Sequence, residues 1–238
     1  MERLNNGVKL TWLGHATWLI ESPAGKRVLV DPWLDGNPAC PDEYKGEGIG
    51  QVDVIICTHG HFDHIADLVS VATRTGATVV GIYDLTNWAE SKGVQNAVGG
   101  NKGGTLSVAG LKVTLVNALH SSSFMDGEES VDMGDPCGFV LEFENGFKIY
   151  NTGDTDVFGD MALIAELYEP DLVMLPIGDH FTMGPRQAAK AIQLMKATRV
   201  VPQHFGTFPL LTGTPGALRQ LVGSGVEVLE VRPGETLS

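Results

Sequence analysis

Three imidazoles and one carboxylate fall within six residues of this chain, as His59, His61, Asp63 and His64, directly after the apolar segment 53–58. Packed histidines have no structural reason to gather in a turn, whereas divalent metal ions need several N and O donors that converge from a rigid strand end. His59 and His61 are two residues apart on extended chain and can point toward one ion. Asp63 and His64 begin a helix and can point toward a neighbouring ion. The spacing predicts a metal site; the alternative is a polar turn without metal.

Short apolar segments separated by turn residues predict the elements that must position these side chains. The predicted strands are residues 8–13, 16–21, 27–31, 53–58, 77–82, 113–118, 137–143, 147–151, 172–176, 199–202 and 226–231. The predicted helices are residues 65–74, 85–92, 160–168 and 185–196, with a short one opened by Thr214-Pro215. Strand-rich segments with helices at intervals in both halves favour two sheets packed face to face, with helices outside. We expect one domain over residues 1–238.

Three more candidate ligands each follow a predicted strand: His120, Asp154 and His204. With these residues in order, the signature His59-Gly60-His61-Phe62-Asp63-His64 resembles that of the metallo-β-lactamase superfamily of metal-dependent hydrolases. The segment Trp12-Leu13-Gly14-His15-Ala16-Thr17 with Asp31-Pro32 is similar to the branch that contains ascorbate-phosphate lactonase and N-acyl-phosphatidylethanolamine phospholipase D. This resemblance implies an α+β protein with a four-layer αββα sandwich.

The resemblance also implies a dinuclear site. It assigns one ion to His59, His61 and His120, the second to Asp63, His64 and His204, and the bridge to Asp154. Each ion keeps an open position, and a hydroxide shared by two ions would be a nucleophile at neutral pH. Zn suits imidazole-rich sites, and Mn, Fe or Ni are alternatives. A redox diiron site is disfavoured because the oxygen-reducing branch has other residue types at the positions of His61 and His64.

Three further roles are predicted near the ligands. We count Asp63 as catalytic, and His15 and His180 as active-site residues outside the metal shell that polarise a carbonyl or protonate a leaving group; the alternative for both histidines is a hydrogen-bonded turn. Asp31 resembles the aspartate that supports the ligand loop, and its alternative is a strand-end turn residue. Asp179 is a weaker candidate for such support.

Composition limits the partners and the compartment. The 238 residues carry a formal net charge of -13 and no Lys/Arg run, which argues against nucleic acid. Three widely spaced cysteines favour a reducing compartment, and no apolar run reaches the ~18 residues of a membrane span. Because the start, residues 1–6, is too polar for a signal peptide, we expect a cytoplasmic protein without a stable membrane anchor. The sequence leaves homo-oligomerisation open.

The substrate is expected to be a small molecule. Two segments, 36–51 and 121–136, are predicted to be irregular, and the second is either an acidic surface loop or a lid whose residues 121–123 face the substrate. Aromatic and apolar residues near the motifs are candidates for an apolar pocket, namely Trp33, Phe181, Met183, Phe205 and Phe208. Lys45 and Arg186 are lone cations rather than a phosphate clamp. We therefore expect hydrolysis of an ester, lactone, thioester or amide; the alternatives are a phosphodiesterase for a small or lipid phosphodiester and a non-catalytic metal-binding protein.

Overall fold

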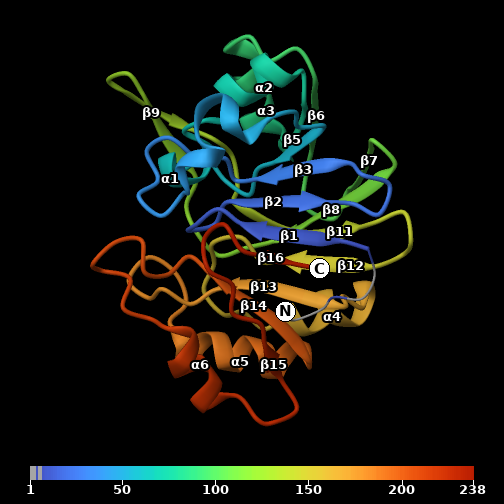
Figure 1. The fold of residues 1–238 in the computed structure, drawn as a ribbon, viewed down its shortest axis with the longest axis vertical. Coiled ribbons are helices and arrows are strands. Elements are labelled where there is room, and N and C mark those ends of the chain that lie inside the picture. Colours follow the sequence, from blue (N-terminus) through green and yellow to red (C-terminus); the bar gives the residue numbers. More distant parts are fainter. Residues whose placement is uncertain (1–3, 5–6) are drawn as a thin grey trace.

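The computed structural model describes residue 4 and residues 7–238 and contains two large sheets with helices on their outer faces (Figure 1). The polar start on which the absence of a signal peptide was predicted lies outside the described residues, apart from Leu4. None of the helices within residues 7–238 combines the length and the apolar character needed to cross a membrane.

Within the described residues, each large sheet has seven strands and joins an antiparallel part to a parallel part. The first sheet has the order β16 (Thr236–Leu237), β1 (Lys9–Trp12), β2 (Trp18–Glu21), β3 (Arg27–Val30), β4 (Val54–Ile56), β5 (Thr78–Ile82) and β6 (Ala97–Gly100). The second has the order β15 (Glu227–Val228), β14 (Arg199–Gln203), β13 (Leu172–Pro176), β12 (Lys148–Asn151), β11 (Cys137–Glu142), β8 (Leu111–Asn117) and β7 (Thr105–Val108). Strands β3 to β6 and β12 to β15 are parallel, so their carboxyl ends meet at one edge of each sheet.

The helices cover both outer faces. They are α1 (Phe62–Ile65), α2 (Leu68–Thr75), α3 (Tyr83–Ser91), α4 (Met161–Tyr168), α5 (Pro185–Met195) and α6 (Pro215–Leu221), with short 3-10 turns η1 (Asp42–Tyr44) and η2 (Gly46–Ile49). In Figure 1, α2 and α3 lie above the strands and α5 and α6 below them. Thr214 caps α6 as predicted, because its hydroxyl accepts a hydrogen bond from the Ala217 amide at 3.2 Å.

Three buried clusters correspond to the spaces between four layers. The central cluster lies between the sheets and includes Trp18, Phe139 and Met174. A second cluster packs α2 and α3 against the first sheet, and a third packs α4, α5 and α6 against the second. The predicted α+β class and four-layer αββα sandwich are therefore confirmed.

Most predicted elements match the structure, and the differences have local causes. The helix predicted over residues 65–74 is divided into α1 and α2, and at the break the Asp67 carboxylate accepts hydrogen bonds from the backbone amides of Leu34 and Asp35. The strand predicted over residues 226–231 shortens to β15. Residues 121–136 are not an irregular loop, because they contain the hairpin of β9 (Ser123–Asp126) and β10 (Glu129–Asp132).

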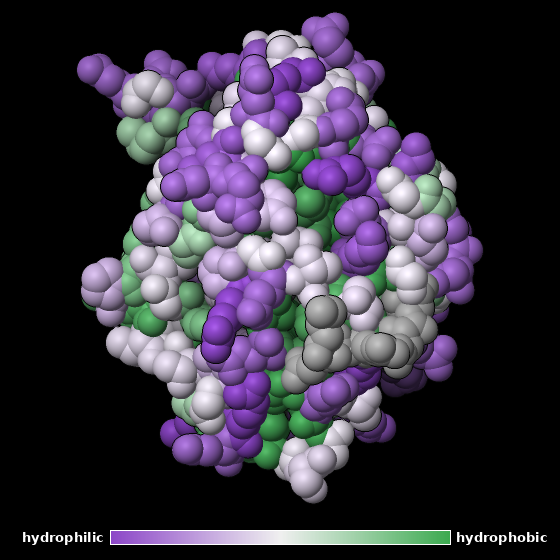
Figure 2. Space-filling view, viewed as in Figure 1, coloured by the Kyte–Doolittle hydropathy of each residue, from purple (hydrophilic) through white to green (hydrophobic). Residues whose placement is uncertain are grey.

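This β9–β10 hairpin stands out from the body of the molecule, at the upper left of Figure 1. Its outer tip is hydrophilic in Figure 2, and hydrophobic residues lie on its underside. The hairpin is attached to α3 because Phe124 packs edge-on against Trp88, with ring centroids 5.3 Å apart, while Asp126 pairs with Lys92 and accepts from the Trp88 indole. It therefore has a fixed place beside the edge where the strands end.

Candidate metal centre and cavity

The His59–His64 segment is held at the carboxyl end of β4 by close packing. This strand is fully buried, and the chain turns after it so that α1 begins at Phe62. A Cβ atom added to Gly60 would overlap the side chain of Met133, so only glycine fits between the two histidines. The Gly60 amide also donates to the Ser122 hydroxyl at 3.1 Å. The packing and the hydrogen bond of Gly60 thus hold the backbone between His59 and His61 in place.

Asp31 fixes the orientation of two imidazoles from beneath. It accepts hydrogen bonds from the Thr58 amide, the Thr58 hydroxyl and His64 Nδ1 at 2.7 to 2.8 Å. Because the Thr58 hydroxyl donates to Asp31, it accepts from His59 Nδ1 at 3.0 Å. Both imidazoles consequently present Nε2 to the interior of the site, and the supporting role predicted for Asp31 agrees with these contacts.

One group of donor atoms matches the first predicted ion. The ring nitrogens of His59, His61 and His120 lie within 4.8 Å of one another. His59 Nε2 and His61 Nδ1 are 2.9 Å apart, and Ser121 Oγ lies 3.2 Å from His61 Nε2. His120 arrives from the segment after β8, so the two sheets both contribute to this group.

Asp154 lies at the centre of the histidines, where a bridging ligand was predicted. Its Oδ2 atom is 3.0 Å from His204 Nε2, 3.2 Å from His64 Nε2, 3.7 Å from His120 Nε2 and 4.0 Å from His59 Nε2. Burial opposes its ionisation, but His204 and His64 outweigh burial and hold the pKa of the Asp154 carboxyl well below its usual range. The Asp154 carboxylate is therefore charged, and its Oδ2 atom lies near imidazoles assigned to both predicted ions.

The second group of donors includes one residue more than the sequence predicted. Asp63, His64 and His204 are joined by His15, and all four ligand atoms lie within 4.8 Å of one another. His15 Nε2 is 2.9 Å from Asp63 Oδ2, and its ring is 3.8 Å from that of His204. His15 Nε2 is therefore grouped with the candidate ligand atoms, and its place outside the metal shell stays a prediction.

Burial keeps His15 neutral. Desolvation and the neighbouring His204 lower its pKa to about 4, while its hydrogen bond to Asp63 acts in the opposite direction. Although burial opposes ionisation of Asp63, the His15 hydrogen bond and the charge of His64 lower the pKa of its carboxyl. The pair is thus a neutral imidazole beside a carboxylate. Thr207, which the sequence analysis missed, holds the other His15 nitrogen with Oγ1 at 3.1 Å from Nδ1.

The residues present fit divalent ions. In the described part of the chain, Asp154 Oδ1 is a buried oxygen without a hydrogen-bond partner, which proteins rarely leave unexplained. The donor set of imidazoles and carboxylates is the one that Zn and related ions take. Burial, and after it the neighbouring His64, keeps the pKa of His59 well below its usual range, so this ring is neutral, as a ligand must be. Although burial opposes it, Asp154 and Asp31 raise the pKa of His64, so this ring must lose a proton when it binds an ion.

Backbone strain is concentrated at the same place. Among the described residues, eight non-glycine residues have positive φ, and five of them belong to the segments that surround the site: His15, Asp31, Asp179, His180 and His204. A left-handed backbone is unfavourable for such residues and persists where the surroundings impose it, typically at functional sites. The His204 amide, for example, donates to the His15 carbonyl at 2.9 Å, which couples two strained turns.

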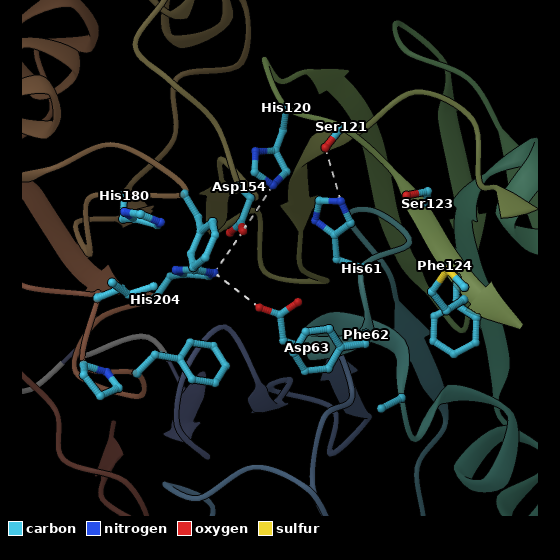
Figure 3. Close-up of a pocket in the computed structure, with 16 residues that line it drawn as sticks. His61, Phe62, Asp63, His120, Ser121, Ser123, Phe124, Asp154, His180 and His204 are labelled. Atoms are coloured by element: carbon cyan, nitrogen blue, oxygen red, sulfur yellow. Dashed lines mark hydrogen bonds and ion pairs between the residues drawn. The ribbon is translucent and has the colours of Figure 1, made fainter. Parts of the chain in front are cut away.

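A cavity of about 1090 Å³ opens over the clustered residues, slightly above the range of about 300 to 1,000 Å³ for small-molecule sites. His61, Asp63, His120, Asp154 and His204 line it, and Figure 3 shows their side chains converging. His180 also lines the cavity, on the side of His204, as its prediction as an active-site residue requires. His15 does not line it and lies beneath Asp63. Asp179 is exposed and accepts the His180 amide through Oδ1.

The predicted pocket residues divide into two groups. Phe181 and Phe208 line the cavity, whereas Met183 belongs to the core beneath α5, and Phe205 stacks on Trp12 with ring centroids 5.1 Å apart. Trp33 is buried behind the cavity. In the 121–123 segment, Ser121 and Ser123 face the cavity and Ser122 is turned inward to Gly60. Phe62 and Leu210, which the sequence did not indicate as pocket residues, also line it, as does Met125 of the candidate lid segment 121–136.

A two-sheet αββα sandwich with histidines and aspartates at the strand ends defines the β-lactamase superfamily fold, and residues 26–205 match the model of the β-lactamase superfamily domain. More closely, the chain belongs to the UPF0173 metal-dependent hydrolase family. It is 52% identical, over the whole length of both chains, to the UPF0173 metal-dependent hydrolase of Roseiflexus sp. strain RS-1.

Solved structures share the fold of this chain. The chain is similar to Igni18, described as a metallo hydrolase from Ignicoccus hospitalis, with a TM-score of 0.86, 35% sequence identity and 97% coverage of both chains. An isothiocyanate hydrolase from Delia radicum gut bacteria is similar in fold, with a TM-score of 0.72 and 21% identity over 97% of this chain and 98% of that one. The family and fold named from the sequence motif are confirmed.

Proposed function

We propose that this protein is a dinuclear metal-dependent hydrolase that cleaves an ester, lactone, thioester or amide bond of a small molecule. The observation that carries the proposal is the convergence of the candidate ligands at the base of a cavity, with Asp154 Oδ2 within 4.0 Å of four imidazole Nε2 atoms. Membership of a metal-dependent hydrolase family supports it.

The first ion is assigned to His59, His61 and His120, the second to Asp63, His64 and His204, and the bridge to Asp154, with Zn as the preferred metal. The donor groups within 4.8 Å support this division and leave His15 as a further donor near the second ion. When bound, two such ions would polarise the scissile group and supply hydroxide as a nucleophile at neutral pH.

The chain's own residues would orient the reaction. Asp63 is held by His15 at 2.9 Å, and this contact keeps its carboxylate turned toward His204, whose Nε2 lies 3.8 Å away. His180 is exposed at the cavity side and can hold or deliver a proton to a leaving group. Ser121, bonded to His61, offers a hydroxyl to the substrate from the opposite side (Figure 3).

A small-molecule substrate is supported by the charge of the site. No residue that lines the cavity in the described ranges is Lys or Arg, and the chain carries a net charge of -13, which disfavours nucleic acid.

The cysteines at positions 40, 57 and 137 are free thiols, as expected of a protein in a reducing compartment such as the cytoplasm.

The test is a substrate panel after metal replacement. Protein stripped with a chelator and reloaded with Zn, Mn, Fe or Ni is assayed on an activated ester, a lactone, a thioester, an amide and bis(4-nitrophenyl) phosphate. We expect turnover of one of the first four classes, lost on chelation and in the His61→Ala variant. Faster cleavage of the phosphodiester would instead favour a phosphodiesterase, and bound metal without any turnover would favour a non-catalytic metal-binding protein.

A further inference from the structure

Two apolar walls enclose the cavity above the candidate metal centre. One wall comes from α1 and the β9–β10 hairpin, and the other from the segments that follow β13 and β14. In Figure 3, Phe62 and Phe124 lie on the side of Asp63 and His61, across the cavity from His180 and His204. The walls together contain Phe62, Phe124, Met125, Phe181, Phe208 and Leu210.

Four of these side chains are exposed although they are large and apolar. Phe62, Met125, Phe181 and Leu210 expose 55%, 60%, 51% and 52% of their surface. Single exposed apolar residues need no explanation, but four around one cavity indicate a binding surface. Of the nine large hydrophobic residues that are exposed among the described residues, these four belong to this one cavity.

Among the described residues, no Lys or Arg side chain lines the same cavity. Its charged residues, Asp63 and Asp154, lie at the base among the histidines, and the remaining polar lining is formed by the Ser121 and Ser123 hydroxyls and His180. A substrate with an anionic group outside the reacting bond would find no Lys or Arg to pair with among the described residues of either wall. An uncharged apolar chain would instead displace water from both walls.

We propose that the cavity selects uncharged esters, lactones or amides that carry an apolar acyl or aryl chain, and that Met125, Phe181 and Leu210 bind this chain. The type of bond that is cleaved rests on the proposed hydrolytic function. The apolar character of the substrate chain rests on the side chains of the two cavity walls. The cavity of about 1090 Å³ is continuous with the candidate metal centre and has room for a chain of several carbons.

Trp33 provides a signal for binding that does not depend on turnover. Its indole stacks on Phe208, with ring centroids 5.6 Å apart, and meets Phe62 edge-on at 5.7 Å. Both phenylalanines line the cavity and contact the indole. An apolar substrate chain bound against either ring therefore changes the surroundings of Trp33. Tryptophan fluorescence therefore reports occupation of the cavity.

The binding experiment titrates the metal-loaded protein with butan-1-ol, hexan-1-ol and octan-1-ol, which are uncharged and cannot be hydrolysed. Each methylene that is fully removed from water strengthens binding by about fourfold, and octan-1-ol has four more methylenes than butan-1-ol. With about half of this added surface buried against the walls, octan-1-ol should bind on the order of tenfold more tightly than butan-1-ol. In the Leu210→Ser and Met125→Ser variants the octan-1-ol affinity should fall about fivefold. Equal affinities of the wild type for the three alcohols would overturn the inference.

The matched control is Leu163→Ser, the same substitution at a leucine of α4 with 51% exposure that does not line the cavity. It should keep the wild-type affinity for octan-1-ol. An equal loss of affinity in Leu163→Ser and Leu210→Ser would contradict a role of the cavity wall.

A kinetic series separates this inference from the proposed function. In 4-nitrophenyl acetate, butyrate and octanoate, kcat/KM should rise with chain length in the wild type, and Leu210→Ser should reduce the value for octanoate more than that for acetate. Binding of octan-1-ol without hydrolysis of any ester, lactone, thioester or amide of the substrate panel would refute the hydrolytic function and leave the apolar site standing. Hydrolysis that is indifferent to chain length would refute the apolar site and leave the hydrolase standing.

Discussion

At the scale of single residues, Asp31 orients two of the predicted ligands without being a predicted ligand itself. Its backbone is left-handed, with φ of 45°. Its carboxylate accepts three hydrogen bonds, from the backbone amide and the hydroxyl of Thr58 and from His64 Nδ1. Through Thr58 it also fixes His59. One carboxylate therefore determines which nitrogen two imidazoles offer to an ion.

Replacement of Asp31 by Asn should weaken metal binding without unfolding the chain. Asn keeps the shape and tolerates positive φ, but its amide cannot accept all three bonds. We expect a loss of about 10- to 100-fold in metal affinity, measured by competition with a chromophoric chelator. The exposed Asp160→Asn should keep wild-type affinity. Unchanged affinity in Asp31→Asn would show that the contacts to Thr58 and His64 are not needed.

The cysteines give a prediction about reactivity. Burial raises the pKa of Cys40 to about 11 and raises the pKa of Cys57 and Cys137 further above the usual value. A raised pKa leaves less of the reactive thiolate at a given pH. At pH 8, Ellman's reagent should therefore react with none of these thiols in the folded protein and with all three in denaturant. A thiol that reacts at once under native conditions would contradict this placement.

At the scale of elements, the two sheets are joined next to the candidate ligands by a buried hydrogen-bond chain. The Trp18 indole of β2 donates to Gln203 Oε1 at 2.8 Å, and Gln203 Nε2 donates to Asn151 Oδ1 at 3.0 Å. Gln203 precedes His204, and Asn151 accepts from the amide of Gly153 beside Asp154. This series of hydrogen bonds thus links β2, β14 and β12 close to the candidate ligands His204 and Asp154.

Gln203→Leu should be destabilising because it leaves the buried Trp18 indole without its acceptor. We expect the free energy of unfolding to fall by about 1–3 kcal/mol, measured by chemical denaturation. The same change at the exposed Gln220 should alter stability by less than about 0.5 kcal/mol. If both variants lose the same stability, the destabilisation does not come from the hydrogen bonds of Gln203 with Trp18 and Asn151.

Elements with strong apolar patterns were predictable from the sequence, and short polar ones were not. The predicted strand 172–176 coincides with β13, and α5 differs from its prediction by one residue. Strands β9 and β10 were missed because they are half-exposed and polar, and β16 because it is a two-residue strand defined by pairing with β1. Such strands exist through their partners, which a local pattern does not contain.

The same limit applies to the site. The HxHxDH spacing predicted a metal centre because its residues are neighbours in sequence, and strand ends predicted the convergence of His120, Asp154 and His204. The contact of His15 with Asp63 joins residues 48 positions apart, and that with Thr207 joins residues 192 apart. Neither could be inferred without the packing of the two sheets.

At the scale of the whole molecule, the candidate ligands come from both sheets. His59, His61, Asp63 and His64 follow β4 of the first sheet, whereas His120, Asp154 and His204 follow strands of the second. Ions held between them would connect the two halves of the sandwich.

Metal removal should therefore lower the thermal stability of the entire chain. An ion at 1,000 times its Kd stabilises the folded state by about 4 kcal/mol if the unfolded chain does not bind it. We expect chelation to lower the midpoint of thermal unfolding by several degrees in one cooperative transition, and added Zn to restore it. A midpoint that is indifferent to chelation would contradict the connection between the sheets.

The central claim is that two ions occupy the base of the cavity, and the number of metal ions per chain tests it most directly. Elemental analysis of the reloaded wild type should give about two ions per chain, and His120→Ala and His204→Ala, which remove a ligand from different ions, should each give about one. A wild type that binds one ion or none, or variants that both retain two, would contradict the account.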